Sequence, residues 1–223
     1  MRQRTSKKIL IYFLILILLS SISNYRLINL TFQKDVNFNI QGLDDANVSN
    51  LVKNFNNLNI ENIFFLNKPK FSEIINSNTL VENFSVFKKY PSDLIIKIAD
   101  TNFLARINFN NQIYIVGSNG KLINNYYTNE NLPFIFGKPE ISEFLEFKKI
   151  IDESGFSYNQ IKNLYFFPSK RWDLELNNNI LLKLPDRNIK EALNQAFEFL
   201  NIKNFDEMKL IDLRVKNQII VEW

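Results

Sequence analysis

Residues 36–55 read VNFNIQGLDDANVSNLVKNF, and the spacing of apolar residues changes within this stretch from that of a strand to that of a helix. Val36 to Ile40 alternates apolar and polar residues, as a half-buried strand does, and Gly42 closes the strand. Asp44 and Asp45 then offer an N-cap and an acidic first turn. The helix that follows has apolar residues at helical spacing: Val48, Leu51, Val52 and Phe55. The stretch therefore predicts a strand followed by an amphipathic helix.

The next residues complete a β-α-α-β-β unit. A shorter helix is expected over 70–76, and strands are expected over 81–88 and 94–99. The turn between these strands is Tyr90-Pro-Ser-Asp93, in which proline pre-sets the backbone and Ser and Asp can bond it. A folded unit of mixed helix and strand is thus expected before residue 103.

The remainder of the chain predicts a sheet-rich region with two helices. Helices are expected over 140–154 and 189–200, from the spacing of their apolar residues. Short alternating segments predict strands over 104–107, 113–116, 121–123, 161–167, 171–176, 180–184, 209–215 and 218–223. The predicted fold class is α+β with mostly antiparallel sheets.

The charge of the chain lies at its beginning. Arg2, Arg4, Lys7 and Lys8 account for the whole formal net charge of +4, so the folded part is neutral overall. A nucleic-acid-binding protein concentrates basic charge on its folded part, where it neutralises phosphates. The sequence therefore argues against a nucleic-acid partner.

The absence of Cys and His removes most catalytic chemistry. Thiolate nucleophiles, imidazole bases, disulfides and Cys or His zinc sites are excluded. The acid pairs Asp44-Asp45 and Asp152-Glu153 lie at predicted helix ends, where capping or solvation is the ordinary role. A hydrolase built on Asp and Glu alone would need two facing carboxylates roughly 5 to 10 Å apart. We predict no catalytic residue, cofactor or metal, and we expect that the chain is not an enzyme.

The basic arm of residues 1–8 is followed by an apolar segment that suits a membrane helix. From Ile9 to Tyr25 a helix spans roughly 25 Å, near the lower limit for a bilayer. The basic arm carries four positive charges before the segment, whereas Arg26 is the lone positive charge just after it. This difference predicts a cytoplasmic N-terminus and an extracytoplasmic remainder. A cleaved signal peptide is the alternative, because Ser21-Ile-Ser23 could form a cleavage site.

Several short segments occur in a characteristic order: Ile40-Gln-Gly42, Lys89-Tyr-Pro91 with Leu94-Ile-Ile-Lys-Ile98, Ile115-Val-Gly-Ser-Asn-Gly120, Leu132-Pro133 with Gly137, Arg171-Trp-Asp-Leu-Glu-Leu176 and Ile211-Asp-Leu-Arg214. In these segments and in the order of its parts, the chain resembles the FtsQ/DivIB family of bacterial cell-division proteins. The resemblance implies a POTRA domain over 34–102 and the family's β domain over 103–223, after a membrane helix over 9–25. It also implies a septal, single-pass inner-membrane protein that acts as a non-enzymatic divisome scaffold and helps link early and late steps of septation.

The family also implies partners and a surface for them. Family members bind an FtsB/DivIC-type bitopic protein, itself paired with an FtsL-type protein, through the last strands of the β domain. An FtsK-type protein is associated with the POTRA domain. By position, the partner-binding residues here are Arg171, Arg214, Val215, Lys216, Asn217, Gln218, Ile219, Ile220, Val221, Glu222 and Trp223.

The residues of this surface could also have roles within the chain. An edge strand over 218–223 could accept a partner strand by β-augmentation, or its apolar residues could be core. Arg171 could bind a partner carboxylate or pair with Asp173 or Glu175, and Arg214 has the same ambiguity with Asp212. For Trp172 we expect burial. The alternative function is a POTRA-containing component of protein transport or outer-membrane assembly.

Overall fold

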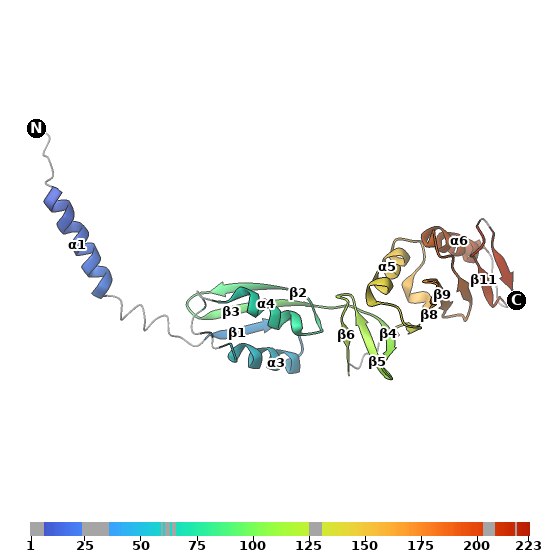
Figure 1. Ribbon diagram of the computed structural model, residues 1–223, viewed down its shortest axis with the longest axis horizontal. Coiled ribbons are helices and arrows are strands. Elements are labelled where there is room, and N and C mark those ends of the chain that lie inside the picture. Colours follow the sequence, from blue (N-terminus) through green and yellow to red (C-terminus); the bar gives the residue numbers. More distant parts are fainter. Residues whose placement is uncertain are drawn as a thin grey trace, which may run out of the picture. The chain divides into compact units, whose positions relative to one another are not determined.

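The structure, a computed structural model, describes residues 7–23, 36–58, 60, 63, 66–124, 131–202, 208–216 and 218–223. It divides into two compact units, the first ending at Asp100 and the second beginning at Thr101. The described residues form five α-helices and two sheets (Figure 1), which confirms the predicted α+β class.

The first helix, α1 (Lys7–Ser23), covers most of the apolar segment near the beginning of the chain. Its large apolar side chains from Ile9 to Leu19 are exposed. Among the described residues, no helix combines the length and the apolarity needed for a membrane crossing. The last two residues of the predicted span 9–25 lie outside the described residues.

The first unit follows the predicted β-α-α-β-β order. Its elements are β1 (Asn37–Gln41), α3 (Asp45–Asn56), α4 (Lys68–Ser77), β2 (Val81–Lys89) and β3 (Asp93–Asp100). In its sheet β3 is central, parallel to β1 and antiparallel to β2.

One face of this sheet carries the core of the first unit. Leu94, Ile96 and Ile98 alternate along β3 and are buried in one cluster with side chains of α3 and α4. The rings of Phe55 on α3 and Phe71 on α4 stack at a centroid distance of 4.2 Å. The two helices therefore cover the same face of the sheet, as the apolar spacing of each predicts.

Local signals in the opening stretch act as the sequence predicts. Asp44 is the N-cap of α3, and its carboxylate accepts the backbone N–H of Asn47 at 3.0 Å, which lowers the pKa of Asp44. Gly42 has φ +101°, and a Cβ at this position would overlap the backbone carbonyl of Ile98. Glycine is therefore required where β1 ends.

The second unit is built on one nine-stranded sheet. Its elements are β4 (Phe103–Phe109), β5 (Gln112–Gly117), β6 (Leu122–Ile123), β7 (Phe134–Phe136), α5 (Ile141–Asp152), a 3-10 turn (Tyr158–Gln160), β8 (Ile161–Phe166), β9 (Trp172–Leu176), β10 (Leu181–Lys183), α6 (Ile189–Ile202), β11 (Leu210–Asp212) and β12 (Ile220–Glu222). The strand order is β12-β11-β10-β9-β8-β7-β4-β5-β6.

Most neighbouring strands in this sheet are antiparallel, as predicted. The parallel pairs are β4 with β7, β7 with β8 and β10 with β11. The sequence did not predict β7, which has three residues and lies between Pro133 and Gly137. It connects the β4-β5-β6 group to the rest of the sheet, so the sheet is continuous only because of this strand.

Helices α5 and α6 pack on one face of the sheet (Figure 1). Leu164, Leu174, Leu182 and Ile211 lie side by side on β8 to β11 and are fully buried in the same cluster as the apolar residues of both helices. Trp172 is 3% exposed, and its ring stacks on Phe147 of α5 at 4.6 Å, so the prediction that Trp172 is buried is confirmed.

Candidate functional site

The strand β12 forms one edge of the nine-stranded sheet. It pairs antiparallel with β11 through Leu210 and Glu222, Ile211 and Val221, and Asp212 and Ile220. Among the described strands, β12 has a neighbour on this side alone. The other side of such a strand presents backbone N–H and C=O groups that an added strand can pair with.

The side chains of this segment alternate between the two faces of the sheet. Ile219 and Val221 are half-buried and pack against the core of the second unit, whereas Ile220 is 45% exposed. Trp223 is 63% exposed. The core alternative is therefore realised for Ile219 and Val221, and Ile220 is exposed on the opposite face. Gln218 and Glu222 are exposed as well.

The strands at this edge are shorter than predicted. The expected strands over 209–215 and 218–223 are reduced to three residues each. After Asp212 the chain turns, because the Asp212 carboxylate accepts the backbone N–H of Arg214 at 3.0 Å. The backbone N–H of Gln218 donates to the carbonyl of Val215 at 3.2 Å, which closes the connection before β12. Val215 and Lys216 are exposed, and Asn217 lies outside the described residues.

Arg214 forms an ion pair with Asp212 rather than extending freely into solvent. Its Nε lies 2.9 Å from Oδ1 and 3.0 Å from Oδ2 of Asp212, and Nη2 also donates to Oδ2. The guanidinium of Arg214 lowers the pKa of Asp212, whose residue is only 8% exposed. The Arg214 side chain remains 43% exposed, so part of the guanidinium can still meet a ligand.

Arg171 is the matching cation at the start of β9. Its Nε lies 3.2 Å from Oδ1 of Asp173, and its guanidinium lies over the ring of Phe167 at 4.4 Å. The Asp173 residue is 3% exposed, and its carboxylate also accepts the backbone N–H of Leu184 at 3.3 Å. Of the two intrachain partners considered for Arg171, the structure selects Asp173, while Glu175 binds Lys162, Asn163 and Tyr165.

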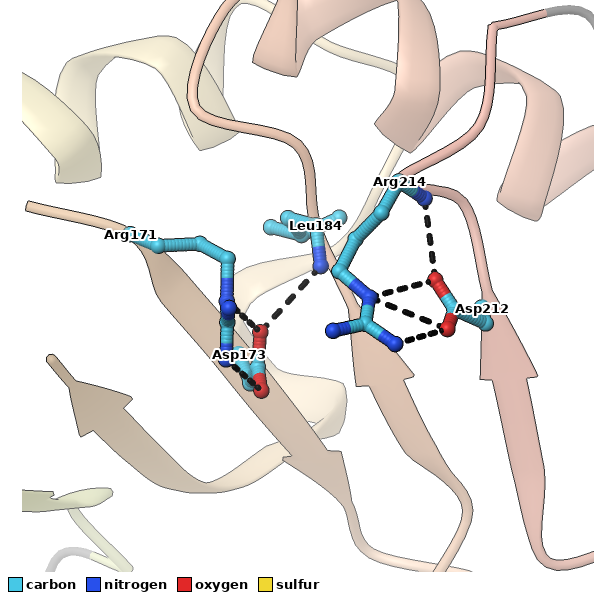
Figure 2. A network of polar contacts seen from close by, with 5 residues as sticks. All are labelled: Arg171, Asp173, Leu184, Asp212 and Arg214. Atoms are coloured by element: carbon cyan, nitrogen blue, oxygen red, sulfur yellow. Dashed lines mark hydrogen bonds and ion pairs between the residues drawn. The ribbon is translucent and has the colours of Figure 1, made fainter. Parts of the chain in front are cut away.

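The structure brings Arg171 and Arg214 to the same end of the sheet (Figure 2). Arg171 precedes β9, which is antiparallel to β10, and Arg214 follows β11, which is parallel to β10. Figure 2 shows Leu184, the residue after β10, between the two ion pairs. The edge strand β12 begins at this same end, because Ile220 is opposite Asp212. The predicted partner-binding residues that the structure describes are therefore close together, and the two arginines share one charged cluster.

Two features near this cluster were not predicted from the sequence. A cavity of about 240 Å³ lies between the start of α6 and residues 213–216; it is lined by Asp186, Arg187, Glu191, Arg214 and Lys216, among others. Lys183, the last residue of β10, is opposite both Asp173 and Asp212 in the sheet. The alternation of β10 could have placed Lys183 on the polar face, but the sequence does not show which strands neighbour β10.

The acidic pairs considered for catalysis have structural roles. Asp44 caps α3, whereas Asp152 ends α5 and pairs with Lys148, and Glu153 is the C-cap of α5. Within the part of the chain that the structure describes, no group of three or more Asp or Glu side chains could hold a metal ion. The described site offers hydrogen bonding, ion pairing and apolar contact.

The second unit is similar to part of a known protein family. Residues 105–214 match the family model described as cell division protein FtsQ/DivIB, C-terminal. The cell division protein FtsQ of Rickettsia bellii is 25% identical over 202 residues, covering 82% of this chain and 70% of that protein.

The second unit of this chain belongs to the FtsQ/DivIB family. Similarity extends to FtsQ of Bradyrhizobium diazoefficiens, 20% identical over 164 residues, covering 72% of this chain and 48% of that protein. The extracytoplasmic domain of DivIB from Geobacillus stearothermophilus aligns with 48% of the chain and 99% of that domain, at 13% identity and a TM-score of 0.35.

The matched FtsQ/DivIB segment spans β4 to β11 and ends at Arg214. It includes Arg171 and Arg214 and stops before β12. Family membership supports a role in cell division for the chain.

Proposed function

We propose that this chain is a non-enzymatic scaffold of the division machinery that binds an FtsB/DivIC-type bitopic protein, together with its FtsL-type companion, through β12. The observation that carries the proposal is that β12 is a sheet edge on which Ile220 is exposed while Ile219 and Val221 are anchored in the core. A partner strand can add to this edge through backbone hydrogen bonds, and Ile220 supplies apolar contact on the outer face.

Arg171 and Arg214 would give this edge its specificity. Both guanidiniums lie at the end of the sheet where β12 begins, and each is oriented by a largely buried carboxylate. An oriented guanidinium can bind a further carboxylate in a fixed geometry with little loss of side-chain freedom. We therefore expect acidic residues in the part of the partner that lies near Ile220.

The remaining parts of the chain fit the same scaffold. We propose that the first unit acts as a POTRA domain that contacts an FtsK-type protein. We further propose that α1 with the basic arm anchors the chain in the inner membrane, with the N-terminus cytoplasmic and both folded units periplasmic at the septum. Such a protein would link early and late steps of septation by binding.

Site-specific crosslinking in living cells tests the partner surface. A photo-crosslinking residue placed at Ile220 of the full-length chain should capture a small single-pass protein with a heptad-repeat segment, identified by mass spectrometry. The same residue at Val221, which faces the core, is the matched control and should capture far less. Equal capture at both positions, or none at Ile220 in a folded and membrane-bound chain, would refute binding through β12.

Removal of the edge strand provides an independent test. A chain truncated after Val215 should keep its secondary structure, because the core of the second unit is built from β4 to β11 and both helices. It should lose the FtsB-type partner in a pull-down. Retained binding by the truncated chain would count decisively against the proposed surface.

A further inference from the structure

Three neighbouring strands place alternating charges side by side on the face opposite α5 and α6. Lys183 of β10 is opposite Asp173 of β9 and Asp212 of β11. Directly paired residues of neighbouring strands project to the same face. Arg171 and Arg214 pair with the two carboxylates at the end of the same row. We call Arg171, Asp173, Lys183, Asp212 and Arg214 the charged row.

The charged row contains three cations and two carboxylates. Asp173 is ion-paired with Arg171 and Asp212 with Arg214. Lys183 lowers the pKa of Asp212 through space, but among the described residues its ammonium group has no hydrogen bond or ion-pair partner. Lys183 is half-buried, so covering it further without an anionic partner would cost free energy. The unused charge therefore favours an acidic ligand over a neutral one.

The position of Lys183 excludes the strand that pairs with β12 as its ligand. Such a strand would lie three strand spacings from β10, or roughly 14 Å at about 4.8 Å per spacing. A carboxylate that reaches Lys183 has to come from a segment that crosses β12 and β11 on the outer face. Leu181 and Leu210 lie on this face, each two residues before a member of the charged row, and both are half-buried. They offer apolar contact to the same crossing segment.

We infer that Lys183 binds a carboxylate of an acidic, partly apolar segment of the partner that crosses the outer face of the sheet next to the strand paired with β12. This inference rests on the proposed function, since it concerns a second contact made by the same partner. Lys183 then sets specificity, because a partner without an acid at this place leaves the ammonium covered and unpaired. The geometry thus adds Lys183 to the cations that the sequence predicted for partner recognition, which are Arg171, Arg214 and Lys216.

Charge substitution at Lys183 tests the inference. We would measure binding of the full-length chain in nanodiscs to the extracytoplasmic part of the FtsB-type protein from the same cell. Lys183→Gln should raise the Kd by about threefold to tenfold and Lys183→Glu by more, with a weaker salt dependence than wild type. Lys149→Glu on α5 is the matched control, because its side chain is 77% exposed on the helical layer, and it should bind as wild type does.

The outcomes separate this inference from the proposed function. Wild-type binding together with unchanged binding by both Lys183 variants would overturn the inference alone, as would an equal loss in Lys149→Glu. No binding by the wild-type chain would overturn the proposed function and the inference with it. Lys183→Gln removes the charge but keeps a flexible polar side chain, and an unchanged melting temperature shows that any loss of binding is not unfolding. Restored binding of Lys183→Glu by an acid-to-lysine change in the partner would identify the contacting residue.

Discussion

Arg214 binds the carboxylate of Asp212 with its backbone as well as its side chain: the guanidinium Nε at 2.9 Å and the backbone N–H at 3.0 Å donate to the same oxygen, Oδ1. The two residues therefore fix each other's orientation at the end of β11, next to the start of β12. A change in the charge of Asp212 should therefore alter both the stability of the second unit and the orientation of the exposed Arg214 guanidinium.

Asp212 should make the second unit sensitive to acid. Arg214 lowers the pKa of Asp212 below its ordinary value of 3.8 in the folded chain. An acid with a depressed pKa stabilises the fold above its unfolded pKa, and this contribution is lost as the pH falls through the folded pKa. The free energy of unfolding in urea should therefore fall more steeply below about pH 4 for wild type than for Asp212→Asn. Asp186→Asn, at an exposed position, should follow the wild-type profile, and parallel profiles for all three chains would contradict this assignment.

Trp172 should be among the most important residues for stability. It is 3% exposed and packs on Phe144, Phe147 and Phe166. Trp172→Ala should lower the free energy of unfolding by about 3 to 5 kcal/mol, as truncation of a buried aromatic residue does. Urea denaturation followed by circular dichroism measures this cost. Trp223→Ala, at a position that is 63% exposed, is the control, and a comparable cost there would show that the two tryptophans are not distinguished by burial.

Adjacent isoleucines before and within β12 should separate stability from binding. Ile219 packs against the core, so Ile219→Ser should lower the free energy of unfolding by about 1 kcal/mol. Ile220 is exposed, so Ile220→Ser should change stability by less than about 0.5 kcal/mol and should weaken partner binding under the proposed function. Thermal melting and a binding titration on the same samples make the comparison. The reverse pattern would show that the alternation of the segment has been assigned to the wrong faces.

Gly42 should be irreplaceable in the first unit. Its φ is +101° and a Cβ would overlap the carbonyl of Ile98, so Gly42→Ala has to move either β1 or β3. We expect a loss of about 1 to 3 kcal/mol in unfolding free energy, with amide exchange accelerated in residues 37–41. Gly120→Ala is a milder comparison, because φ is +75° there and only the Leu145 side chain is nearby. A larger cost at Gly120 would contradict the steric explanation.

The sequence predicted well what depends on local patterns. The strand and helix within residues 36–55 follow from alternation, a capping aspartate and helical spacing, and these are properties of neighbouring residues. The burial of Trp172 follows from the same period of two. Long-range information was not needed for any of these features.

What the sequence could not predict depends on which strands become neighbours. The strand β7 has three residues, too few for alternation to be recognised, and it exists because β4 and β8 pair with it from both sides. The choice of Asp173 over Glu175 as the partner of Arg171 depends on the strand next to β9, since Glu175 is held by Asn163 and Tyr165 of β8. The position of Lys183 between two aspartates likewise requires knowledge of both neighbouring strands.

The strand β12 is joined to the sheet through only three residue pairs. A strand held by so few pairs opens easily, and the free energy of this local opening is well below the free energy of global unfolding. A partner that binds only the closed strand adds its own binding free energy to the cost of that opening. The protection of amide protons in β11 and β12 against exchange would then rise with the fraction of the chain that has bound its partner. Hydrogen exchange in these two strands would therefore measure complex assembly directly.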